Sequence, residues 1–186
     1  MDLNFPFPLD AAQPVPFTIA VNESFVRQTV RKAADYRPSA DLLDDSNTNW
    51  LEGPPRANMT ALAGHWATDY DWAAEQDRIN GELSHFAVVV PETEAWPHAV
   101  PLHYVHELTE NNDDDDDALP LLLLHGWPST SLEWSEVIPH LVSPPDGSKG
   151  HDVVAVDLPG FGASPALPDG VPYDLPTVAR ALGKLC

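Results

Sequence analysis

The chain has 186 residues, which fits one ordinary domain, and 43% of them are hydrophobic, enough for a packed core. It carries 29 acidic residues against 9 Lys and Arg, a formal net charge of −20. This balance argues against a nucleic-acid partner, because phosphates are neutralised by Lys and Arg. The one cysteine is Cys186, so no disulfide can form within the chain, which suits a reducing compartment.

The N-terminal sequence MDLNFPFPLDAAQ has no basic region followed by an apolar run, so it does not read as a secretory signal. No apolar stretch is long enough to span a bilayer. We therefore expect a soluble protein of the cytoplasm or another intracellular compartment. The run Asp113–Asp117 predicts a solvated acidic loop. Calcium binding is the alternative, but the run lacks the alternating ligands and turn glycine of a calcium loop.

The first part of the chain predicts helices. Residues 22–36 begin with Asn22, which can cap a helix, and Pro54 and Pro55 end the loop that follows. Residues 61–82 predict two short helices, with Asp71 capping the second and Asn80–Gly81 ending it. The apolar residues of the first helix share one face at helical spacing: Phe25, Val26, Val30 and Ala33.

The second part predicts strands and helices in alternation. Residues 83–90 and 100–108 predict two antiparallel neighbours. The apolar run 119–124 predicts a strand covered on both faces. Residues 130–141 predict one helix with a capping box between Thr130 and Glu133, a strand ends at Val156, and a helix begins near Thr177. One face of the second strand would carry Val100, Leu102, Tyr104, His106 and Leu108.

This order predicts an α/β fold whose sheet has a parallel part and helices on its faces. In such sheets, chemistry gathers outside the carboxyl ends of the strands. Two suggestive turns lie there: HGWP, His125 to Pro128, follows Leu124, and DLPGFG, Asp157 to Gly162, follows Val156.

The HGWP turn leads from a strand into a helix start, where backbone N–H groups have no partner in the strand. Fixed N–H groups of this kind suit a developing oxyanion. Gly126 allows close backbone approach, and Pro128 can hold a cis Trp127–Pro128 bond. The alternative is a plain strand-to-helix turn with a buried Trp127.

The DLPGFG turn is neither a phosphate loop nor a dinucleotide fingerprint, because it lacks a Gly-Lys-Ser/Thr ending and the G-x-G-x-x-G spacing. Asp157, Pro159, Gly160 and Gly162 are interpreted as a structural turn. The eight histidines do not predict a metal site, since His103 and His106 fall on opposite faces of a strand and no H-E-x-x-H pattern or cysteine pair occurs. No G-x-S-x-G nucleophile elbow occurs either.

Three segments together resemble the epoxide hydrolases of the microsomal type, within the α/β-hydrolase fold. They are HWATDYDWAAEQDRINGELSHF at 65–86, LPLLLLHGWPSTSLEWSEVIPHL at 119–141 and HDVVAVDLPGFGAS at 151–164. The H-G-x-P element alone is shared with many α/β hydrolases, including haloalkane dehalogenases, whereas the N-terminal segment narrows the match. The resemblance runs from about Pro16 to Cys186.

The resemblance implies four parts: a flexible N-terminus at 1–15, an epoxide hydrolase N-terminal segment with the first two sheet strands at 16–110, an acidic loop at 111–118 and a partial α/β-hydrolase domain at 119–186. The sheet would be mixed and incomplete, with four strands. Their spatial order would be first, second, fourth, third, which leaves strand 119–124 at an edge. An apolar edge strand invites association, so we expect poor solubility or a partner.

The resemblance also implies a mechanism, which needs no cofactor. An Asp attacks a small-molecule epoxide to form an alkyl-enzyme ester, lid tyrosines assist the epoxide oxygen, and a His oriented by an acid activates the water that releases a diol, a detoxification reaction. The Trp127 backbone N–H would supply half of the oxyanion hole, supported by His125, Gly126 and Pro128.

No position of this sequence matches the family's nucleophile, its triad His and acid, or its lid tyrosines. Asp157 lies in the glycine turn, and His125 belongs to the oxyanion motif. We therefore expect a truncated epoxide hydrolase that is inactive alone. The alternatives are a fragment of another α/β hydrolase, such as a haloalkane dehalogenase or esterase, and a non-catalytic module that pairs through strand 119–124. The tyrosines that do not match the lid are Tyr36, Tyr70, Tyr104 and Tyr173.

Overall fold

The computed structural model divides the chain into two compact units, residues 1–20 with 78–186 and residues 21–77, and each is described by itself. The predicted acidic loop, 111–118, lies outside the described residues. None of the helices in the described part of the chain is long and apolar enough to cross a membrane. The structure describes residues 6–40, 50, 53–92, 98–109, 120–167, 170–171 and 173–183.

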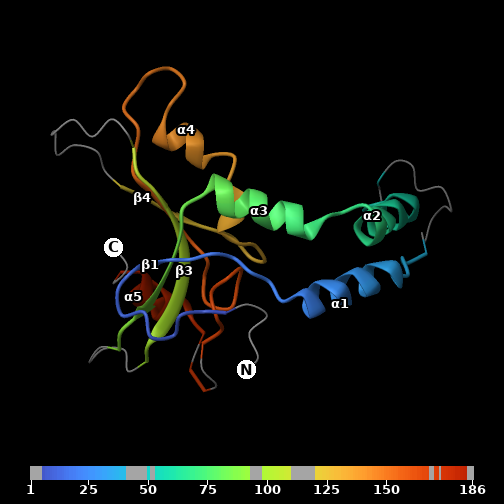
Figure 1. Ribbon diagram of the computed structural model, residues 1–186, viewed down its shortest axis with the longest axis horizontal. Coiled ribbons are helices and arrows are strands. Elements are labelled where there is room, and N and C mark those ends of the chain that lie inside the picture. The colour runs from blue at the N-terminus through green and yellow to red at the C-terminus, as the bar shows by residue number, and fades with distance from the viewer. Residues whose placement is uncertain are drawn as a thin grey trace. The chain divides into compact units, whose positions relative to one another are not determined.

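The first unit is built on a five-stranded mixed sheet in the order β1-β2-β3-β5-β4. Figure 1 labels β1, β3 and β4 of this sheet. β4 and β5 run parallel and the other neighbours pair antiparallel, which confirms the mixed sheet and the order predicted for its last four strands. The strands are β1 (Val15–Pro16), β2 (His85–Val90), β3 (Val100–Glu107), β4 (Leu121–Leu124) and β5 (Val153–Val156).

The prediction of four strands missed β1. This strand has two residues and includes a proline, too short for an alternating pattern to show. It pairs with β2, and the Val89 N–H donates to the Ala11 carbonyl at 2.7 Å. These contacts bring part of the predicted flexible N-terminus into the sheet.

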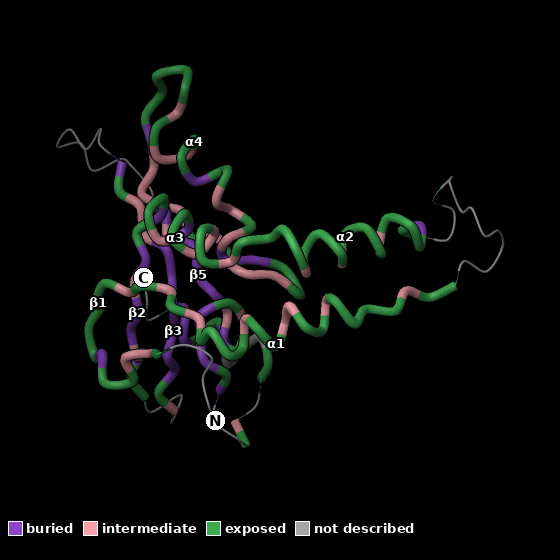
Figure 2. The backbone as a smooth tube through the Cα atoms, turned by 45° about the vertical axis from the view of Figure 1, so that its right-hand side comes forward, coloured by how far each residue is buried: buried purple, intermediate pink, exposed green. Residues whose placement is uncertain are grey.

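The two faces of the sheet bury separate clusters, and Figure 2 shows buried residues gathered in the strands. Helix α5 (Leu175–Leu182) packs Val178 and Leu182 on the face that holds Leu102 and Tyr104. The 3₁₀-helix η1 (Ser131–Trp134) and helix α4 (Ile138–Val142) pack on the other face. Helices on both faces confirm the α/β architecture. Of the predicted face of β3, Leu108 lies past the strand's end and is exposed.

The prediction that strand 119–124 is covered on both faces is wrong. Leu121 and Leu123 pack with the cluster around Ile138. Leu122 and Leu124 are 39% and 43% exposed, because the cluster beneath α5 includes no side chain from β4. One face of the edge strand is therefore apolar and open.

The predicted helix 130–141 is also wrong, since the chain forms η1 and then α4. Thr130 caps η1 by accepting the Leu132 N–H at 3.3 Å, but Glu133 accepts the Gly126 N–H and makes no capping box. Pro139 has no N–H to continue a helical ladder, which explains the break before it.

The second unit contains α1 (Glu23–Ala34), α2 (Arg56–Thr68) and the start of α3 (Trp72–Glu82). Both predicted caps are confirmed: Asn22 accepts the Ser24 N–H at 2.8 Å, and Asp71 accepts two N–H groups of α3. α3 does not end at Asn80–Gly81, because the Asn80 amide instead bonds the backbone of Ile19 at 2.9 and 2.8 Å.

The packing of β3 and β4 predicts unequal effects of truncating two leucines. Leu102 is fully buried, so L102A should lower the free energy of unfolding by about 2–5 kcal/mol. L122A, on the open face of β4, should cost about 1 kcal/mol or less. Urea unfolding followed by circular dichroism measures both, and equal losses would contradict this packing.

Candidate active site

Parallel pairing of β4 with β5 brings the two predicted turns together. Leu124 is the register partner of Val156, so both turns leave the sheet at the same edge. The Leu158 N–H donates to His125 Nε2 at 3.0 Å, and the His125 ring meets the Phe161 ring edge-on at 5.4 Å. His125 is buried. Its imidazole therefore joins the start of the HGWP turn to the glycine turn.

Asp157 holds the other end of the same turn. Its Oδ1 accepts the Ser131 N–H at 2.6 Å, and its Oδ2 accepts the Ala163 N–H at 2.8 Å. The side chain is almost fully buried. Asp157 and Leu158 together anchor residues 125–131 at both ends.

Trp127 lies between these anchors. The Trp127–Pro128 peptide bond is cis. Among the described residues the Trp127 N–H has no hydrogen-bond partner, whereas the Gly126 N–H donates to Glu133. The Trp127 side chain is 84% exposed, which contradicts the alternative of a plain turn with a buried tryptophan.

A hollow of about 430 Å³ opens beside the Trp127 residue. Apolar groups dominate its wall, and partial burial raises the pKa of the Tyr173 phenol that lines it. A free N–H at the rim of an apolar hollow suits a small apolar molecule that develops charge on one oxygen. The lining residues are His125, Gly126, Trp127, Leu158, Phe161, Tyr173, Asp174 and Val178.

Two buried histidines join Asp157, and the sequence did not reveal them. His103 Nδ1 lies 2.8 Å from Asp157 Oδ2, and His103 Nε2 lies 3.0 Å from His85 Nδ1. His85 Nε2 lies 3.1 Å from the Ile79 carbonyl oxygen. The sequence signal that could have indicated this contact was the predicted antiparallel pairing of the two strands, because each strand contributes one of the two histidines. Only the register shows that they meet.

The environment lowers the pKa of two of these groups, Asp157 and His85. Burial opposes the charge of Asp157, but the hydrogen bond and charge of His103 and the two backbone donors outweigh it and lower the Asp157 pKa. Burial, with His103 second, lowers the pKa of His85. Asp157 is therefore a carboxylate held by donors. Among the described residues, no group of three or more His, Cys, Asp or Glu side chains is arranged so that it could hold a metal ion.

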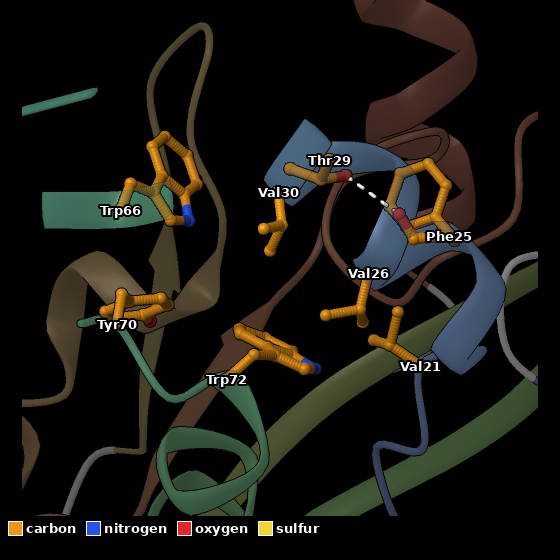
Figure 3. A pocket seen from close by; sticks show the side chains of 8 residues that line it. All are labelled: Val21, Phe25, Val26, Thr29, Val30, Trp66, Tyr70 and Trp72. Carbon is orange, nitrogen blue, oxygen red and sulfur yellow. Dashed lines mark hydrogen bonds between the residues drawn. The ribbon is translucent and has the colours of Figure 1, made fainter. Parts of the chain in front are cut away.

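The second unit has an apolar hollow of its own, of about 260 Å³, between α1, α2 and the start of α3 (Figure 3). Its walls are aliphatic and aromatic, and Trp66 meets Tyr70 edge-on at 6.2 Å. The Thr29 hydroxyl in its wall donates to the Phe25 carbonyl at 3.1 Å. No carboxylate, imidazole or amine lines it, so the turns of the first unit are the better candidate site.

A family model described as the epoxide hydrolase N terminus matches residues 14–134, more than half of the chain. The chain belongs to the epoxide hydrolase family. A model of the alpha/beta hydrolase fold matches residues 120–186. Because the N-terminal match is specific to epoxide hydrolases, the dehalogenase and esterase alternatives lose support.

Relatives of this epoxide hydrolase chain are much longer. One from Stigmatella aurantiaca is 31% identical over 175 residues, which cover 91% of this chain and 36% of the relative. The solved juvenile hormone epoxide hydrolase of Bombyx mori has a TM-score of 0.72 and 25% identity, with 100% of this chain and 42% of that chain covered. The Aspergillus niger epoxide hydrolase, at 21% identity and a TM-score of 0.73, shares the fold over 97% of this chain and 44% of its own. The chain thus spans less than half of each.

Two glycines of the site predict opposite outcomes on substitution. A Cβ at Gly162 would overlap the Asp157 carboxylate, and the φ of Gly162 is +51°. A Cβ at Gly126 would meet nothing within 4 Å. G162A should therefore lower the free energy of unfolding by about 2 kcal/mol or more, and G126A by about 1 kcal/mol or less. Equal urea midpoints for the two variants would show that the glycine turn does not enclose Asp157 this closely.

Proposed function

We propose that this chain is the part of an epoxide hydrolase that supplies one oxyanion-hole donor, the Trp127 backbone N–H, for hydrolysis of an epoxide to a vicinal diol. The observation that carries the proposal is an N–H that no described residue bonds, held between two anchors at the rim of an apolar hollow. In the ester-hydrolysis step that the family implies, this donor would stabilise the oxyanion without reorganisation.

A different observation supports the role of each residue that flanks Trp127 in the HGWP turn. His125 orients the start of the turn through Leu158, Gly126 has open space above it, and Pro128 forms the cis bond. The oxyanion roles of these residues and the structural role of the DLPGFG turn are proposals that this geometry supports. An intracellular location stays a prediction from the sequence.

The 186 residues alone should not turn over an epoxide. A nucleophile is needed to form the ester, and Asp157, which anchors the turn, is enclosed by three hydrogen bonds. A buried carboxylate whose two oxygens already accept three hydrogen bonds is not available to attack a substrate in the hollow.

The experiment is to read the coding DNA past the codon for Cys186 and to express the longest in-frame product beside the 186-residue chain. We expect a further strand ending in a G-x-D-x-G-like elbow, and diol formation from a simple aryl epoxide by the longer product only. A G-x-S-x-G elbow with esterase activity would contradict the proposed reaction. Diol formation by the 186-residue chain, above a heat-killed control, would contradict its inactivity.

The outer edge of β4 is the surface through which we propose that the chain associates. Among the described residues β4 pairs with β5 alone, so its other edge keeps free backbone donors and acceptors. Leu122, Leu124 and Trp127 add exposed apolar area beside that edge. The net charge of −20 opposes self-association, so added salt should strengthen it.

A charge on this edge should therefore reduce association. L124K places a lysine on the open face of β4, whereas L108K changes an even more exposed leucine that lies past the end of β3. We expect sedimentation velocity to show fewer associated species for L124K than for wild type, and no change for L108K. A wild-type chain that stays monomeric in high salt would contradict this surface.

A further inference from the structure

A continuous chain of hydrogen bonds runs through the buried interior of the first unit. It links Asp157 to His103, His103 to His85 and His85 to the Ile79 carbonyl, at 2.8, 3.0 and 3.1 Å. The two imidazole rings are nearly parallel, with an angle of 23° between their planes and 5.1 Å between their centroids, and all three side chains are buried. We call these three side chains the Asp157 trio.

The number of protons in the trio follows from these bonds. Each of the three hydrogen bonds needs one proton, and the Ile79 carbonyl can only accept. Three protons must therefore be shared among one carboxyl group and two imidazoles. A carboxylate and two neutral imidazoles hold only two, so the trio carries one more and has no net charge. A neutral trio is what a buried site favours.

The extra proton belongs to the histidine pair rather than to the carboxyl group. Asp157 also accepts the Ser131 and Ala163 N–H groups, one on each carboxylate oxygen. A protonated carboxyl could still accept one of these donors, but a carboxylate accepts all of them more strongly, and together with His103 they lower the Asp157 pKa. The arrangement that these donors favour is a carboxylate beside one cationic histidine, with the extra proton in the His85–His103 bond.

Few other groups face the trio. Glu107 on β3 adds a favourable charge toward His85, and the Phe17 ring lies 5.3 Å from His103. The Ser164 hydroxyl accepts the His103 N–H at 2.8 Å and donates to the Asp157 carbonyl at 2.6 Å. The Ser164 hydroxyl thus links the backbones of His103 and Asp157 independently of the side chains of these two residues.

We propose that the Asp157 trio positions residues 125–131, the segment that carries the Trp127 N–H. In it, a proton held by His85 and His103 keeps Asp157 ionised and bonded to Ser131. Loss of that proton leaves a buried carboxylate without its countercharge. A second extra proton makes both rings cationic, so that an N–H group of each ring points at the other and the His85–His103 hydrogen bond breaks. The effect on epoxide hydrolysis rests on the proposed function, whereas the proton count and the anchoring of the turn do not.

The experiment reads the histidine charge states directly in the 186-residue chain. Magic-angle-spinning ¹⁵N spectra of histidine-labelled protein do not depend on its state of association. At about pH 8 exposed histidines are neutral. We expect one cationic ring among the eight histidines, with a ¹⁵N–¹⁵N cross peak to a neutral ring because His85 and His103 lie 3.0 Å apart. Eight neutral rings, or a cationic ring without that cross peak, would overturn the proposal.

A matched pair of variants tests the positioning. D157N satisfies the histidine chain with neutral rings when its NH₂ donates to His103, and that NH₂ then also faces the Ala163 N–H; in the flipped orientation the NH₂ faces the Ser131 N–H instead. We expect the cationic ¹⁵N signal to be lost. We also expect hydrogen exchange, measured by mass spectrometry, to become about tenfold faster or more in the peptide 125–134 or the peptide 158–167. D69N alters the exposed His65–Asp69 pair and should change neither readout.

Each outcome of this pair decides the proposal. A cationic signal that survives in folded D157N, or unchanged exchange in both peptides, would overturn it, as would the same changes in D69N. If circular dichroism shows that D157N does not fold, the wild-type cross peak decides alone. None of these readouts depends on catalysis, so inactivity of the longer product leaves the trio standing.

Discussion

The buried carboxylate of Asp157 is the group on which the geometry of the site depends. It stands at the end of β5 and receives donors from Ser131 at the start of η1, from the glycine turn and from β3. Burial of a carboxylate is costly unless donors surround it, and here three do so. The close approach of Gly162 leaves room for no side chain there. One ionised group thus fixes the relative positions of three segments that are distant in the sequence.

The parallel pairing of β4 and β5 determines what that carboxylate can reach. Because Leu124 and Val156 are partners, the residues that follow them emerge side by side. His125 and Leu158 then close one bond, and Ser131 and Asp157 close another. Between them, the Trp127 N–H has no partner among the described residues.

Much of this arrangement was predictable. The apolar period of β2, β3 and β5, the caps at Asn22 and Asp71 and the order of the last four strands depend on local patterns or on the family resemblance. The features that were missed depend on distant partners. Glu133 bonds Gly126 instead of its own helix start, and Asn80 bonds Ile19 instead of ending a helix. The His85–His103 contact depends on strand register, and β2 and β3 bury residues on both faces, so their sequences have no clear alternation that would fix the register.

The open face of β4 and the helices α1 and α2 of the second unit all leave apolar side chains exposed. Neither α1 nor α2 has a buried side chain, and Leu122 and Leu124 remain exposed. Such apolar surfaces are characteristic of elements that pack against further structure. Relatives more than twice as long as the matched region are consistent with this.

The most direct test of the account is the exchange of individual backbone amides in residues 125–131, resolved by fragmentation mass spectrometry. The account predicts that the Ser131 N–H is protected by Asp157, whereas the Trp127 N–H exchanges near the rate of an unstructured peptide. A protected Trp127 N–H would mean that the donor is already bonded within the chain, and the oxyanion role would be contradicted.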